Sequence, residues 1–236
     1  MKEMKMFAFD SPLMNVLNKI SDLMWLNILA VLCCIPVVTA GASLTALHYM
    51  ALKIVRDEET YIARGFFKSF KDNFKQATII WLILLVGFGL IIGDFIITWN
   101  MAGTFYQVLR AVFTVAGLLL LFEYAFVFPI LAKFDNTIKT TMKNALVISI
   151  VQFPKTIVMI LLPIVFIALI WFFPVMFPIV LLFGTSVSAW IAAKLYNKFF
   201  TGLEERIMAA NPPAQEAVSE EAIFTDESRL PQTKEQ

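Results

Sequence analysis

Long apolar runs alternate along this chain with shorter polar segments that are rich in lysine. Four apolar regions stand out, at residues 23–55, 77–97, 111–132 and 156–193. A transmembrane helix needs about 20 apolar residues, so the first and the fourth regions are each long enough for two crossings. The pattern therefore predicts an all-α, polytopic membrane protein.

Proline residues divide the two longest regions. Pro36 lies within the first, and Pro174 and Pro178 lie in the middle of the fourth. Proline disfavours a helix interior, so each region is expected to fold as two helices joined by a tight turn, with the first pair at 12–35 and 40–55. This gives six spans. A five-span alternative, in which the first region forms one tilted helix, is also open.

The distribution of basic residues favours six spans. If both termini are cytoplasmic, all 19 lysine and arginine residues except Arg110 lie on the cytoplasmic side. This follows the positive-inside rule, whereas five spans would export three lysines. We expect a helical transmembrane domain over residues 1–207 with both termini in the cytoplasm.

Two cytoplasmic segments have amphipathic patterns. In the segment before the third span, large apolar side chains recur at every fourth position: Ile62, Phe66, Phe70 and Phe74. Basic side chains follow another face: Arg64, Lys68, Lys71 and Lys75. We interpret this helix as an interfacial anchor attracted to anionic lipid, with docking of a partner as the alternative. The segment 133–155 repeats the pattern more weakly.

The chain changes character at its end. Residues 208–236 include six acidic and two basic residues and a Pro-Pro pair. Such a segment cannot bury a core, so we predict a disordered, acidic cytoplasmic tail.

Composition limits the classes of function. The 236 residues are 59% hydrophobic and only 16% charged, and the mean hydropathy is +0.77. A soluble domain has about 25% charged residues, so an ordinary soluble enzyme is excluded. The net charge of +1 gives no basic field for nucleic acid, and the lipid bilayer is the expected partner.

Enzyme and cofactor motifs are missing from the sequence. His48 is the single histidine, which excludes a two-histidine zinc motif. The chain has neither a phosphate-binding loop of the G-x-x-x-x-G-K-[ST] type nor a G-x-S-x-G nucleophile elbow. We therefore expect no enzymatic activity, no metal and no cofactor.

Three ionisable residues lie inside predicted spans, where each is costly unless it is paired or hydrated. Glu123 is the deepest, and a structural carboxyl and a substrate or proton site are equally good interpretations of it. Asp94 lies about one turn before Trp99 at the outer end of its span, and His48 lies midway along the short return helix. For both of these a structural role is favoured.

Small residues form two rows on predicted spans. One is the G-x-x-x-G motif of Gly89 and Gly93, and the other comprises Gly184, Ser188 and Ala192. Both rows predict close helix packing rather than cofactor loops.

Several strings resemble one known family. They are DLMWLN at 22–27, LCCIPVVTAGASLTALHY at 32–49, FFKSFKDNFKQA at 66–77, FPILAKF at 128–134 and KNA at 143–145. Over roughly residues 7–200 the chain resembles the YesL-like family of bacterial integral membrane proteins, which is a domain of unknown function.

The resemblance implies a cellular setting but no chemical activity. Members are similar in being plasma-membrane proteins of Gram-positive bacteria, often encoded near carbohydrate importers of the ATP-binding-cassette (ABC) type. No activity, ligand or catalytic residue comes with the family. The first hypothesis is thus a non-enzymatic protein that assists or regulates such an importer, whose subunits would be its partners. The alternative is a small transporter or channel subunit that uses Glu123, and the oligomeric state is open.

Overall fold

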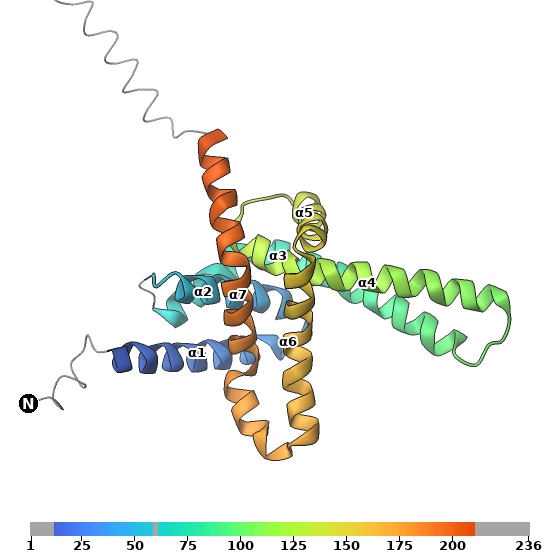
Figure 1. Cartoon of the computed structure of the whole chain (residues 1–236), viewed down its shortest axis with the longest axis horizontal. Coiled ribbons are helices and arrows are strands. Elements are labelled where there is room, and N and C mark those ends of the chain that lie inside the picture. Colours follow the sequence, from blue (N-terminus) through green and yellow to red (C-terminus); the bar gives the residue numbers. More distant parts are fainter. Residues whose placement is uncertain (1–11, 59–60, 211–236) are drawn as a thin grey trace, which may run out of the picture. The chain divides into compact units, whose positions relative to one another are not determined.

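The computed structural model describes residues 12–58 and 61–210 (Figure 1). In this part of the chain every regular element is helical, which confirms the all-α prediction. The helices are α1 (Pro12–Cys34), η2 (Val37–Thr39), α2 (Ala40–Val55), α3 (Ile62–Thr98), α4 (Thr104–Lys133), α5 (Ile138–Val151), α6 (Phe153–Phe172), η3 (Pro174–Met176) and α7 (Phe177–Ala210). The predicted tail lies outside the described residues from position 211 onward.

Six helical stretches in the described residues are long and apolar enough to cross a membrane. They are Val16–Cys34, Val37–Val55, Ile62–Thr98, Thr104–Lys133, Phe153–Phe172 and Pro174–Ala210. The number agrees with the six-span prediction. The single tilted helix of the five-span alternative is wrong, because η2 separates α1 from α2.

The turn between α1 and α2 is built by Pro36 and Thr39. Pro36 has an extended backbone (φ −74°, ψ 110°), which ends the first helix. The Thr39 hydroxyl lies within hydrogen-bond distance of the carbonyl oxygens of Cys33, at 2.7 Å, and Pro36, at 2.9 Å. Carbonyls at a helix end need such partners. The helix α2 begins one residue after Thr39, at Ala40, as predicted.

The helix α2 is held between α1 and α3. Ser43 donates to the carbonyl of Ala30 in α1 at 2.8 Å, and the Trp81 indole of α3 donates to the carbonyl of Val37 at 2.7 Å. Of the span containing α2, 61% is buried within the protein. This helix is therefore the centre of the packing among the first three helices.

The amphipathic segment is part of a longer helix. It is continuous with the third span in α3, which has 37 residues and is about 55 Å long at 1.5 Å per residue. The hydrocarbon core is only about 30 Å thick, so one end of α3 extends beyond it. Ile62 and Phe66 are buried in the protein, while Phe74 is 40% exposed. The interpretation as a separate interfacial anchor is thus corrected, because helices of the chain cover the start of its apolar face.

The last spans follow the predicted proline break. The helix α6 ends at Phe172, η3 starts at Pro174, and α7 starts at Phe177. Between α4 and α6, the segment 133–155 contains α5, whose cap residue Thr137 accepts a hydrogen bond from the Thr140 backbone. The chain divides into two compact units, residues 1–195 and 196–236. Of the second, the described part is the helical segment 196–210 at the end of α7.

Candidate functional site

A buried asparagine joins α1 to α7. The Asn27 amide nitrogen donates to the Leu181 carbonyl at 2.6 Å. Its side-chain oxygen accepts from the backbone N–H groups of Thr185, at 3.0 Å, and Ser186, at 2.9 Å, and from the Thr185 hydroxyl at 2.5 Å. Leu181 and Thr185 are one helical turn apart, so one amide contacts two successive turns of α7. Polar side chains often connect transmembrane helices in this way.

Asn27 is absent from the candidates predicted from the sequence. Those candidates were sought among ionisable groups, and Asn27 is neutral. The sequence nevertheless contained a signal for this contact, because an amide side chain inside an apolar span must find hydrogen-bond partners. Its exposed fraction is 0%, which fits a structural role in holding the helices together.

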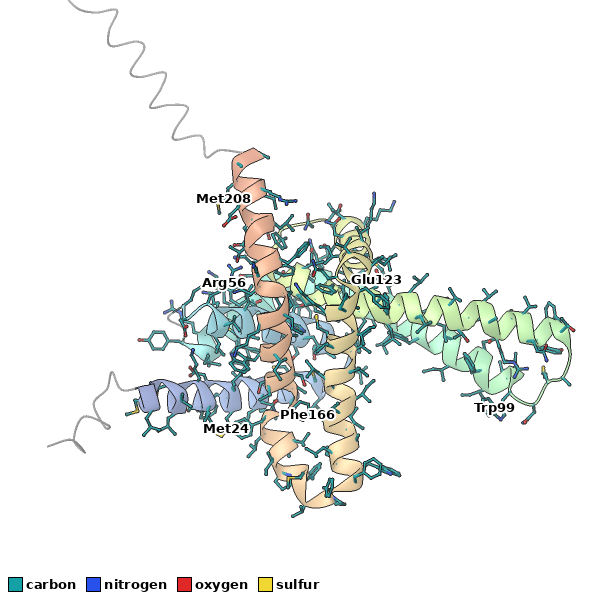
Figure 2. All side chains as sticks on the ribbon, viewed as in Figure 1. Met24, Arg56, Trp99, Glu123, Phe166 and Met208 are labelled. Carbon is teal, nitrogen blue, oxygen red and sulfur yellow. The ribbon has the colours of Figure 1, made fainter. Side chains whose placement is uncertain are left out.

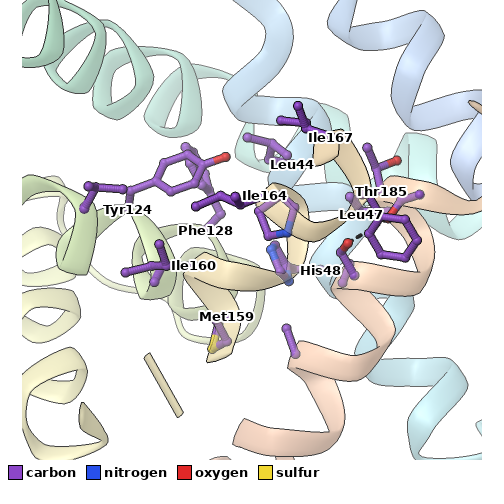
Figure 3. A pocket seen from close by; sticks show the side chains of 18 of the residues that line it. Leu44, Leu47, His48, Tyr124, Phe128, Met159, Ile160, Ile164, Ile167 and Thr185 are labelled. Carbon is purple, nitrogen blue, oxygen red and sulfur yellow. Dashed lines mark hydrogen bonds between the residues drawn. The ribbon is translucent and has the colours of Figure 1, made fainter. Parts of the chain in front are cut away.

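A cavity of about 400 Å³ lies among α2, α4, α6 and α7. Figure 3 shows side chains from these helices converging on it, among them Leu44, Leu47, Tyr124, Phe128 and Ile164. Its volume is within the usual range of small-molecule sites, about 300–1,000 Å³. Most of the lining residues are apolar, and all of them belong to the unit of residues 1–195.

Some of the polar side chains around this cavity already have partners. The Thr185 hydroxyl donates to Asn27, and the Ser188 hydroxyl donates to the carbonyl of Gly184 at 2.7 Å. His48 and Tyr124 also line the cavity (Figure 3). The walls thus offer few polar groups for a ligand.

The structure does not bring the three predicted residues together. His48 lines the cavity, whereas neither Glu123 nor Asp94 does. Glu123 is 9% exposed on α4. Asp94 lies on α3, one side-chain oxygen is buried without a hydrogen bond, and its backbone carbonyl accepts from Thr98 at 2.8 Å. The carboxylate of Glu123 (labelled in Figure 2) forms no hydrogen bond or ion pair within residues 12–58 and 61–210.

The two small-residue rows differ from expectation. A Cβ atom at Gly89 or Gly93 would have nothing within 4 Å. The prediction of close packing is therefore wrong for contacts of this motif within the protein. Gly184, Ser188 and Ala192 instead form part of the cavity wall.

A second, smaller cleft is polar. It has a volume of about 240 Å³ and is lined by Tyr49, Lys68, Ser69, Asp72, Asn73, Leu131, Ala132, Lys133 and Asp135. The lining carries both signs of charge and comes from α2, α3, α4 and the residues after α4. Among the described residues, no cluster of three or more histidine, cysteine or acidic side chains is suited to a metal ion.

The first three helices contain the part of the chain that matches a family model. Residues 23–95, which include Asn27, the turn at Pro36 and Trp81, match the family model described as "Protein of unknown function, DUF624". No curated protein and no solved structure matches the chain. DUF624 is the YesL-like family, so the match over residues 23–95 of this multi-pass helical protein confirms the resemblance seen in the sequence.

Proposed function

We propose that the protein is a non-enzymatic accessory protein of the bacterial plasma membrane that assists or regulates a carbohydrate importer of the ABC type. The carbohydrate context comes from the resemblance to the YesL-like family. The choice of an accessory role over transport rests on one observation, the apolar lining of the cavity among α2, α4, α6 and α7.

A sugar would be poorly accommodated in this cavity. Each hydroxyl that leaves water without a new hydrogen bond costs about 1–3 kcal/mol by protein mutational data. Thr185 and Ser188 already donate to groups of the protein. Asn27, Ser43 and Trp81 likewise make contacts between helices. These polar groups are thus engaged in contacts within the protein and are not available to a sugar. This supports a role that assists a separate permease.

The alternative is a small transporter or channel subunit. Glu123 favours it, because an intramembrane carboxylate is a functional candidate by default. Glu123 is 9% exposed on α4 and does not line the cavity. A transport role for Glu123 would therefore need a route other than this cavity.

We further propose that both termini are cytoplasmic. The support is the charge distribution, in which Arg110 is the one basic residue on the other side. This orientation puts the start of α3, the helix α5 and the polar cleft in the cytoplasm. The ATPase subunits of an importer are on that side, so these elements would be accessible to them.

Affinity purification tests the accessory role. The tagged protein, extracted in mild detergent from cells growing on an oligosaccharide, is expected to bring down permease and ATPase subunits of an importer. The control is an unrelated six-span protein with the same tag and expression level. Recovery of the tagged protein without importer subunits, while the importer is present in the extract, would contradict the proposal.

A further inference from the structure

Lysines follow the apolar cavity along its wall helices. Each of its four wall helices has a lysine just beyond the lining: Lys53 after His48, Lys133 after Phe128, Lys155 before Met159 and Lys194 after Ala192. At a rise of 1.5 Å per residue, these lysines follow the lining after about 3–8 Å. From Lys155, the lining continues along α6 to Ile167, a distance of about 18 Å by the same rise. Half of the hydrocarbon core is about 15 Å thick, so the lining along α6 is about as long as one leaflet is deep.

The cavity is open to the bilayer along α6. Ile164 is 51% exposed and Ile167 is 68% exposed, and both line it. A chain from the surrounding leaflet has lateral access to the cavity there. Since the lining is mostly apolar, the part of a ligand that it suits is hydrocarbon.

Two lysines beside the cavity, on α6 and α7, are available to an anion. Near the end of α2, by contrast, Lys53 forms an ion pair with Glu58 at 3.5 Å. Lys155 of α6 and Lys194 of α7 form no ion pair within the described residues, and Lys194 lies over the Trp190 ring at 3.5 Å from its centroid. Positive charge therefore lies just beyond the lining on α6 and α7, about 3–6 Å from its nearest residues.

We propose that this cavity binds one acyl chain of an anionic phospholipid from the lysine-side leaflet, with Lys155 and Lys194 contacting the phosphate. The apolar walls account for the chain, the opening at α6 for its entry, and the two lysines for the charge of the headgroup. The site is independent of the proposed accessory role, because it requires only that the protein lies in a membrane.

Native mass spectrometry with two matched variants tests the chain site. The purified protein is expected to retain one phosphatidylglycerol, and to retain phosphatidylcholine at least tenfold less. Ser188→Phe fills the cavity without removing an interhelical hydrogen bond and is expected to lower retention about tenfold. Leu182→Phe adds bulk to the same helix at a position outside the lining, 37% exposed, and should leave retention unchanged. Equal retention in both variants would overturn the proposal.

Neutralising the lysines tests the headgroup contact. Lys155→Gln with Lys194→Gln is expected to abolish the preference for phosphatidylglycerol over phosphatidylcholine. Lys139→Gln with Lys143→Gln removes the same charge from α5, whose lysines do not follow the cavity lining, and should keep the preference. Loss of the preference in both double variants would show a general charge effect and contradict the site.

A measurement on the unaltered protein guards against misfolded variants. Phosphatidylglycerol carrying a photoreactive diazirine at mid-chain is expected to crosslink to cavity residues of α6 and α7, such as Phe166 and Val180. Crosslinks spread over the exposed apolar residues of α3, such as Val86 and Ile96, without enrichment in the cavity, would overturn the proposal.

Discussion

Replacing Gly41 with alanine is expected to destabilise the protein by about 1–3 kcal/mol or more, the usual range for overpacking. A Cβ atom at this position would lie 2.5 Å from both the Ala77 carbonyl oxygen and the Trp81 Cβ. Neither atom is the end of a flexible side chain, so α2 and α3 must move apart. The hydrogen bond from Trp81 to Val37 would be weakened at the same time. Thermal unfolding of the purified protein in detergent measures the effect.

Gly89→Ala is the matched control. It is the same substitution in another membrane helix, and a Cβ there would have nothing within 4 Å. Alanine is favoured over glycine inside a helix by roughly 0.5–1 kcal/mol, so this variant should be unchanged or slightly more stable. Equal melting temperatures for the two variants would show that the contact between α2 and α3 is not tight.

Replacing Asn27 with leucine is the second change with a large expected effect. Leucine has the same branching and number of heavy atoms but makes none of the hydrogen bonds to Leu181, Thr185 and Ser186. Interhelical hydrogen bonds in membranes average about 0.6 kcal/mol and reach about 1.7. The loss of four such contacts is therefore expected to lower the free energy of unfolding by roughly 2–3 kcal/mol. Reversible unfolding in mixed micelles measures this value.

Asn18→Leu supplies the comparison for this variant. Asn18 is an exposed asparagine on the same helix, and surface substitutions usually stay within about 0.5 kcal/mol. A loss of stability of similar size in both variants would mean that the contacts of Asn27 with α7 contribute nothing specific. A loss confined to Asn27→Leu supports its role in joining α1 to α7.

Helix limits were predictable where proline determines them. The helix from Pro12, the helix from Ala40 to Val55 and the break at Pro174 were all evident from the sequence. Proline acts on its own backbone and on that of its neighbours, so its effect is readable without knowledge of tertiary contacts. The continuity of α3 was not predictable in this way, because aromatic residues at every fourth position suit both a lipid surface and a neighbouring helix.

Contacts between distant segments account for what the sequence did not reveal. The partners of Asn27 lie 154–159 positions away along the chain, and the cavity combines four helices from Leu44 to Ala192. Of the three residues singled out, His48 lines the cavity and the two carboxylates do not. Side-chain type identified these residues as unusual in a membrane, but only the packing shows which of them share a site.

We propose that this protein does not itself move sugar or protons. Reconstitution of the purified protein into liposomes, with labelled oligosaccharide outside and a pH-sensitive dye inside, tests it most directly. We expect no uptake and no proton flux above those of protein-free liposomes, and the same result for Glu123→Gln. Flux through the unaltered protein that disappears in Glu123→Gln would contradict the claim and establish the transporter alternative.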